Sequence, residues 1–365
     1  MKSRVAGETG VPKKNSMPVK DRAVKANIAT GEEVLPVERC LQIHRIMVLA
    51  RALEERMIKM SKSGEGFFWI GGPGEEAFNT CLGFQVKKGE GPKFDYLHFH
   101  YRNSATMLAM GMEPIDAIRQ MAMTWTDPFS RGRNFPSHFS RKAWNVVPVS
   151  SVIEVQFAMA PGTAIMQKRH GDAVTIVVGG DAGAAQGDFT SCLLWSSRPG
   201  NELPVIIITM NNGWGISTSH CSQHSCEHTI ERGKAFGIPG EVVDGNDPVA
   251  CWYAVERAFR YSRSTRRPFM LEAMVARLNG HSSSSGALRS DEPDCIAMFE
   301  DRLLAADMLT QSAIDDVHAE AHSECDDGVA QVMREPRPGF ADIDKFTYSP
   351  SEVDAVYPGD YTGLP

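Results

Sequence analysis

The sequence lacks any apolar run of membrane-spanning length, so we expect no segment of it to cross a membrane. It also lacks an excess of basic residues, because 38 Lys and Arg stand against 45 Asp and Glu, which gives a formal charge of −7. A chain of this charge has no electrostatic footprint for nucleic acid. With 365 residues, 42% of them hydrophobic, it is long and apolar enough to bury a full core.

No disulfide framework is visible among the eight cysteines. Four of them lie in apolar helical patterns, and we expect these to be reduced core residues of a cytoplasmic protein: Cys40, Cys81, Cys192 and Cys251. The first 35 residues contain no apolar segment, unlike a secretory signal, and they are richer in Lys and in acidic residues than a mitochondrial transit peptide. We therefore predict a flexible arm over residues 1–35, one domain over 36–330 and a tail over 331–365.

Three continuous apolar runs predict buried strands at residues 173–178, 203–210 and 268–277. Continuous runs, unlike alternating ones, are typical of a parallel sheet that is covered on both faces. The segment 188–198 has the pattern of a crossover helix between the first two runs. These patterns predict an α/β fold with a mostly parallel sheet between helices, followed by a helical C-terminal region that begins near residue 292.

Asp181 and Asn212 each follow one of the first two predicted strands. Ligands bind at the carboxyl edge of open α/β sheets, so the two side chains would meet there if their strands are neighbours. Carboxylate and amide oxygens suit Mg²⁺ with a diphosphate completing its shell. The glycines around Asp181, including Gly183, allow the backbone to approach phosphates before a helix N-terminus. Either half alone would more often be an ordinary turn, but both in order predict a cofactor site.

This pair, in the stretches Gly180-Asp181-Ala182-Gly183 and Asn211-Asn212-Gly213-Trp214, resembles the thiamine diphosphate motif. The second stretch continues with Gly-Ile-Ser-Thr and resembles the α subunit of 2-oxo acid dehydrogenases, the decarboxylating component, most of all the branched-chain (2-oxoisovalerate) type. The resemblance covers roughly residues 40–330 and contains about six ordered motifs. It implies the thiamine diphosphate-binding fold. One departure is Ala182, where the motif has glycine, which is tolerable if its φ angle is negative.

The resemblance implies how the cofactor is held. Magnesium would be bound by Asp181, Asn212 and the backbone carbonyl of Trp214, with Ala182 and Gly183 beside the cofactor. The diphosphate would be bound by Tyr101 and Arg102, which end a short predicted strand, and by His281. Alone, Arg102 would more often be a surface ion-pair partner and His281 an exposed loop residue.

The same resemblance assigns residues to the rest of the cofactor and to the substrate. Ser151 and Ile153 match residues that support the aminopyrimidine ring, by a polar contact and by an apolar wedge. His138 lies in a Gly-Arg-x-x-Pro-x-His segment and would hold the substrate carboxylate or the reaction intermediate. His281 would act as a second catalytic histidine, since imidazole titrates near neutral pH. A lone histidine is otherwise more often structural.

The implied activity is the oxidative decarboxylation of a branched-chain 2-oxo acid and the reductive acylation of a lipoyl domain. The cofactor also needs a glutamate on its aminopyrimidine ring, which two-chain members take from a β subunit. No β-like half is found in this sequence, so the resemblance implies an α2β2 heterotetramer that passes the acyl group to a lipoyl-bearing acyltransferase. Met210 stands where branched-chain enzymes have an arginine, so one phosphate contact is expected to be missing.

Other interpretations remain open at this point. The chain could be the α subunit of a pyruvate or acetoin dehydrogenase. It could also be a non-catalytic protein on the same fold, an interpretation supported by Ala182 and Met210. A third alternative is a zinc-binding interaction protein, because three His and two Cys lie within residues 220–228, although their spacing matches no common zinc motif.

Overall fold

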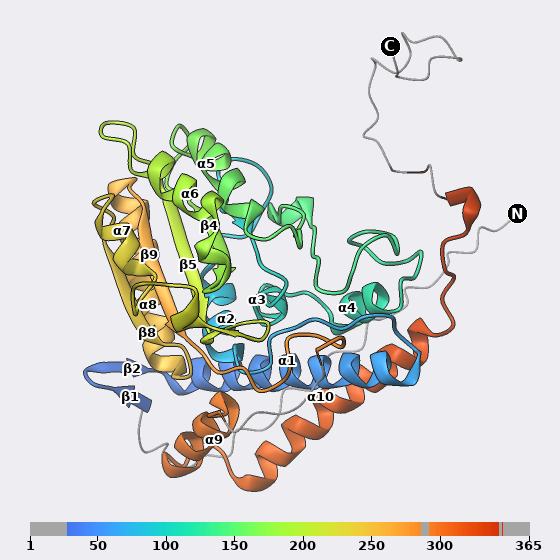
Figure 1. The fold of residues 1–365 in the computed structure, drawn as a ribbon. Helices are drawn as coiled ribbons and strands as arrows, with labels where there is room; N and C mark the ends of the chain where they lie inside the picture. Colours follow the sequence, from blue (N-terminus) through green and yellow to red (C-terminus); the bar gives the residue numbers. More distant parts are fainter. Residues whose placement is uncertain (1–27, 286–291, 343–344, 346–365) are drawn as a thin grey trace, which may run out of the picture.

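A five-stranded sheet forms the centre of the computed structural model, which describes residues 28–285, 292–342 and 345 (Figure 1). The strand order is β3-β4-β5-β9-β8, and every neighbouring pair is parallel. The strands are β3 (Tyr96–His98), β4 (Thr175–Gly180), β5 (Val205–Asn211), β8 (Gly240–Asp244) and β9 (Phe269–Met274). The predicted parallel α/β fold is therefore confirmed.

Both faces of this sheet are covered, which explains its continuous apolar strands. On one face, Val177 and Ile207 pack with the helices α5 (Val155–Gln167) and α6 (Gly187–Ser196). On the other face, the alternate residues of the same strands belong to a larger core. That core also contains α1 (Val37–Ser63), α2 (Glu76–Gln85) and α8 (Pro248–Thr265).

The longest helix, α1, runs beneath the sheet and is paired with the C-terminal helix α10 (Gln311–Val332) (Figure 1). Helix α9 (Cys295–Ala305) packs beside them and completes the predicted helical C-terminal region. The remaining described helices include α3 (Ser104–Ala109), α4 (Pro114–Met121) and α7 (Ile230–Lys234). All four cysteines predicted for the core are buried.

The last residues of the predicted N-terminal arm form a hairpin. Strands β1 (Ile28–Thr30) and β2 (Glu33–Leu35) pair in antiparallel fashion. The hydroxyl of Tyr253 on α8 donates to the carbonyl of Val34 at 2.6 Å, and Arg257 pairs with Glu33. Residues 28–35 are thus docked on α8, whereas residues 1–27 of the predicted arm lie outside the described part of the chain.

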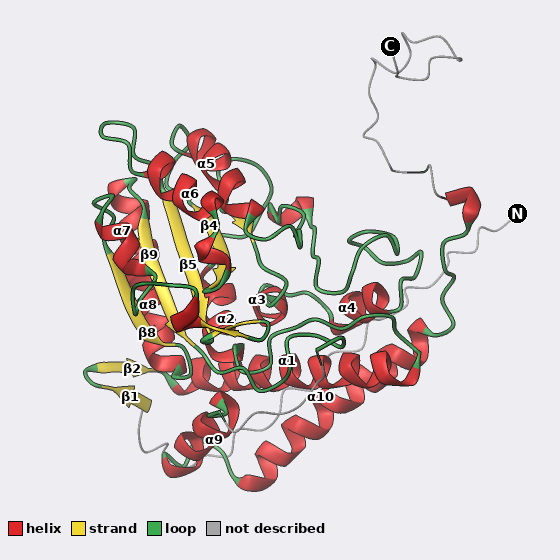
Figure 2. Cartoon of the chain, viewed as in Figure 1, coloured by secondary structure: helices red, strands yellow, loops and turns green. Residues whose placement is uncertain are grey.

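A second small hairpin, β6 (Trp214–Gly215) with β7 (Thr218–Ser219), follows β5. The connection between α4 and α5 runs almost entirely as loop (Figure 2). Within the described residues, no helix combines the length and the apolar character that a membrane crossing needs.

Candidate active site

The carboxyl ends of β4 and β5 bring Asp181 and Asn212 to the same edge of the sheet. The two strands are direct neighbours, with Gly180 in register with Met210, and the Asp181 amide donates to the Met210 carbonyl at 3.2 Å. Asp181 and Asn212 are 1% and 5% exposed. The condition on which the predicted site depended, adjacent strands, is met.

The backbone after each strand turns without strain. Ala182 has a φ of −61°, the negative value that lets alanine replace the glycine of the motif. Gly213 has a φ of +75°, a left-handed conformation that favours glycine. It allows the amide of Trp214 to donate to Asn212 Oδ1 at 3.1 Å. The Met210 side chain is 1% exposed and packs in the core.

Tyr101, Arg102, His138 and His281 gather around one point, although they come from distant parts of the chain. The Arg102 guanidinium lies 4.9 Å from the Tyr101 ring centroid and donates to His281 Nδ1 at 3.1 Å. The Tyr101 ring centroid is 6.0 Å from that of His281 and 6.4 Å from that of His138. Because His281 Nδ1 accepts, its ring is neutral with the proton on Nε2.

Electrostatics hold His281 in the neutral form. Burial, followed by the positive charges of Arg102 and Arg277, lowers the pKa of His281 to about 4. The ring therefore offers an N–H donor throughout the neutral pH range.

Two buried glutamates that sequence analysis did not identify lie beside Arg102 and Asp181. Glu75 Oε1 accepts from Asn212 Nδ2 at 3.4 Å and lies 3.6 Å from Arg102 Nε. The other oxygen, Oε2, is buried without a hydrogen-bond partner. Burial raises the pKa of Glu75 to about 7, against the opposing effect of the Arg102 charge.

Glu154 is the second of these glutamates. Its φ of +62° is left-handed, a conformation that costs energy for a residue with a side chain. This backbone directs the carboxyl group inward, where Oε1 accepts from the Gly180 amide at 3.2 Å. A Cβ atom on Gly183 would lie 1.6 Å from Oε1, so only glycine fits there. Burial raises the pKa of Glu154 to about 8.

His138 and Ser151 lie on the long loop between α4 and α5 and contact each other directly. His138 Nδ1 donates to the Pro136 carbonyl at 3.0 Å, so its Nε2 accepts the Ser151 hydroxyl at 2.5 Å. Burial lowers the pKa of His138. Ser151 is exposed, and Ile153 is 62% exposed, so neither is covered by the residues that the structure describes.

The His- and Cys-rich segment at residues 220–228 folds back over Asp181. His220 Nδ1 donates to Asp181 Oδ2 at 3.0 Å, and His224 Nε2 donates to the Asp181 carbonyl at 2.8 Å. The two imidazole rings stack with centroids 4.5 Å apart. In the described part of the chain, this segment supplies no group of three ligand atoms close enough to bind a metal. Its histidines instead hold a predicted metal ligand, a role that sequence analysis missed because the contact spans about 40 residues.

These residues fit a magnesium ion with a diphosphate. Asp181 and Asn212 offer the hard oxygen ligands that Mg²⁺ prefers. Arg102, 5% exposed, is a buried cation with planar donors suited to phosphate oxygens. The partnerless Glu75 Oε2 shows that polar contacts in the site are incomplete within this chain.

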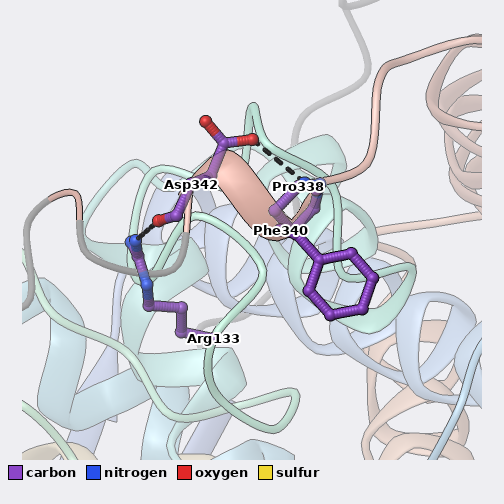
Figure 3. A pocket seen from close by; sticks show the side chains of 5 residues that line it. Arg133, Pro338, Phe340 and Asp342 are labelled. Atoms are coloured by element: carbon purple, nitrogen blue, oxygen red, sulfur yellow. Dashed lines mark hydrogen bonds between the residues drawn. The ribbon is translucent and has the colours of Figure 1, made fainter.

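A pocket of about 330 Å³ lies elsewhere, between Arg133 and the segment that follows α10 (Figure 3). Arg133 donates to the Asp342 carbonyl, and the Gly339 amide donates to Asp342 Oδ2 at 3.0 Å. Phe340 is 93% exposed at its rim. None of the predicted site residues lines this pocket.

Comparisons with known proteins agree with this geometry. Residues 44–341 match the Dehydrogenase E1 component family. The 2-oxoisovalerate dehydrogenase subunit alpha of Bacillus subtilis (strain 168) is 32% identical over 249 residues, which cover 67% of this chain and 73% of the relative. The mitochondrial 2-oxoisovalerate dehydrogenase subunit alpha 2 of Arabidopsis thaliana is 30% identical over 253 residues, and the mitochondrial subunit alpha of Homo sapiens is 29% identical over 259 residues. The matched regions cover 69% and 70% of this chain but only 52% and 56% of those two relatives. On the extent of the family match and on this level of identity, the chain belongs to the Dehydrogenase E1 component family.

Proposed function

We propose that this chain is the α subunit of a thiamine diphosphate-dependent 2-oxo acid dehydrogenase, its decarboxylating component. The observation that carries the proposal is the meeting of Asp181 and Asn212 at one sheet edge, in a chain of this family. The names of its relatives support a branched-chain 2-oxo acid, 2-oxoisovalerate, as the substrate.

In this proposal the chain holds the charged end of the cofactor. Asp181, Asn212 and the Trp214 carbonyl bind Mg²⁺, and His220 orients the Asp181 carboxylate through Oδ2. Arg102 and the Nε2 proton of His281 donate to diphosphate oxygens, with Tyr101 beside them. The Gly183 turn gives the phosphates a close approach to the backbone.

Thiamine diphosphate, when bound, supplies the electron sink that allows a 2-oxo acid to lose CO₂. This chain's own contribution is binding, orientation and proton control. In this proposal the Ser151 hydroxyl and the Ile153 side chain would support the aminopyrimidine ring, and His138 would hold the substrate carboxylate. The Ser151 hydroxyl donates its hydrogen bond to His138 Nε2. Because Nε2 accepts this bond it carries no proton, and the imidazole is neutral.

A partner chain is expected to complete the site. Val152 and Ile153 are 67% and 62% exposed, which is unusual for apolar side chains beside an active site. The aminopyrimidine glutamate would come from a β subunit in an α2β2 heterotetramer. A lipoyl-bearing acyltransferase would then receive the acyl group.

The direct test is to co-produce the chain with a β-like partner and to measure 2-oxo acid-dependent reduction of an artificial electron acceptor. The expected result is turnover that requires both thiamine diphosphate and Mg²⁺, faster with 2-oxoisovalerate than with pyruvate. Faster turnover with pyruvate or acetoin would assign the chain to one of those dehydrogenases. No turnover with any of them, from a well-formed complex, would refute the proposal and favour a non-catalytic role.

A further inference from the structure

Three side chains from three helices converge at a second place, which the proposed function does not use. His44 belongs to α1, Glu300 to α9 and His318 to α10. One ligand atom from each lies within 4.8 Å of the other two. Among the described residues this is the one group of three potential metal ligands brought so close together.

The two histidines are directed at a single point. His44 Nε2 lies 2.8 Å and His318 Nε2 2.7 Å from the same atom, Glu300 Oε1. In the structure both imidazoles donate to this oxygen, whose two lone pairs can accept two hydrogen bonds. Loss of the two Nε2 protons would make both nitrogens available as metal ligands beside the carboxylate.

The spacing requires little rearrangement to accept an ion. Metal–nitrogen and metal–oxygen bonds of about 2.0–2.2 Å at tetrahedral angles separate ligand atoms by about 3.4 Å. The present separations of 2.8 and 2.7 Å would therefore widen by well under 1 Å. Side-chain rotation can supply this change, because the side chain of His318 is 36% exposed and its imidazole has room to turn outward.

Burial is graded across the group. The side chain of His44 is 2% exposed, that of Glu300 17% and that of His318 36%. The inner ligand is thus fixed in the core, whereas the outer ligands face solvent. An ion can enter from that side, and water can take the remaining coordination position.

The ligand types select the class of ion. Two imidazole nitrogens and one carboxylate oxygen favour zinc and its late first-row neighbours over Mg²⁺ or Ca²⁺, which prefer all-oxygen shells. We propose that His44, Glu300 and His318 form a zinc-type divalent metal site that joins α9 and α10 to α1. Its role is structural, because an ion bound by the folded state alone stabilises that state.

The experiment uses the full chain in complex with its β-like partner, stripped with a chelator and kept in excess Mg²⁺. Zn²⁺ is added, free metal is removed by dialysis, and bound zinc per chain is measured together with the thermal midpoint. We expect one zinc ion per α chain and a higher midpoint. The His318→Gln variant should lose the zinc ion and the rise in the thermal midpoint, although the glutamine amide can still donate to Glu300.

His322→Gln is the matched control. His322 lies one turn further along α10 and pairs with Glu55 of α1 at 4.0 Å, without a third ligand. This variant should retain the zinc ion and the midpoint shift. His224→Gln tests for zinc bound by the His- and Cys-rich loop, and it should retain both as well.

The inference is overturned if no zinc remains after dialysis, or if His318→Gln retains the same zinc content and midpoint shift as the unmodified chain. Equal loss in His322→Gln would also overturn it, since the effect would then not depend on the three-ligand group. The test is independent of the proposed activity, because neither measurement needs turnover.

Discussion

Asp181 is held from two sides by imidazoles, and this is the least expected feature at the scale of single residues. A carboxylate that binds a metal needs a fixed orientation, which neighbouring hydrogen bonds usually supply. The bond from His220 engages Oδ2, which leaves Oδ1 available to the proposed cation. His220 is therefore a positioning residue for the proposed Mg²⁺ site, acting through Asp181.

His220→Ala is expected to weaken binding of the divalent cation by about 10- to 100-fold, the usual effect of removing a hydrogen bond to a metal ligand. The measurement is a titration of the complex with Mn²⁺ in the presence of thiamine diphosphate, followed by the fluorescence of the nearby Trp214. His220→Asn should recover much of the affinity, because its amide can donate to Asp181.

His228→Ala provides the control for this prediction. His228 belongs to the same loop, but its Nδ1 lies 3.7 Å from Glu272 Oε2 and it makes no hydrogen bond or ion pair with Asp181. The affinity of the His228→Ala complex for the divalent cation should be unchanged. The effect would come from the loop as a whole if His228→Ala weakened cation binding as much as His220→Ala, or if His220→Asn did not recover the cation affinity.

At the scale of elements, apolar patterns located the strands β4, β5 and β9 and the crossover helix α6 within a few residues. They succeed because buried strands and amphipathic helices are determined by local side-chain composition. The resemblance placed Arg102 and His281, which the fold brings together. Glu75 and Glu154 were missed because their significance depends on burial and on partners far along the chain. The docked hairpin β1–β2 was missed because each strand has only three residues.

Element packing also makes a testable prediction at the crossing of α2 and α3. A Cβ atom on Gly83 would lie 2.4 Å from the Thr106 carbonyl oxygen and 2.7 Å from Ala109 Cβ. These are atoms of α3 that cannot rotate away. Gly83→Ala should therefore lower the free energy of unfolding by about 1–3 kcal/mol, despite alanine's better helix propensity. Urea unfolding of the α chain, followed by circular dichroism, measures the change.

Gly162→Ala in α5 is the matched substitution. A Cβ atom there would meet no described atom within 4 Å apart from the backbone of its own helix. In the same urea experiment it should raise the stability of the α chain by about 0.5–1 kcal/mol, because alanine loses less backbone entropy in a helix. If Gly83→Ala left the free energy of unfolding unchanged, α2 and α3 would be able to move apart, contrary to the close packing described.

At the scale of the whole molecule, buried carboxyl groups and buried imidazoles make stability depend on pH in opposite directions. Burial raises the pKa of Glu54 and Glu75 to about 7 and that of Glu154 to about 8. At these three carboxyl groups the folded chain therefore binds more protons than the unfolded chain between about pH 4.5 and 8, and their contribution to stability falls as pH rises through this window. Burial also lowers the pKa of His98 and His281 to about 4, so these groups make stability rise between about pH 4 and 6.5.

The two contributions oppose each other below about pH 6.5, but only the carboxyl contribution remains above it. Without cofactor or Mg²⁺, the free energy of unfolding should therefore decline from about pH 6.5 to 8.5. Each carboxyl group contributes at most ~1.4 kcal/mol per pH unit. Urea unfolding at a series of pH values measures this decline.

Glu154→Gln isolates one of these contributions, because the amide oxygen can still accept from Gly180 and the side chain no longer titrates. The variant should gain stability relative to the original chain at pH 8.5 and much less at pH 6, so that its decline is shallower. Parallel curves for the two proteins would mean that Glu154 is already ionised in the folded state at neutral pH. Its burial would then be offset by Arg102, and the carboxylate charge would face the cation site.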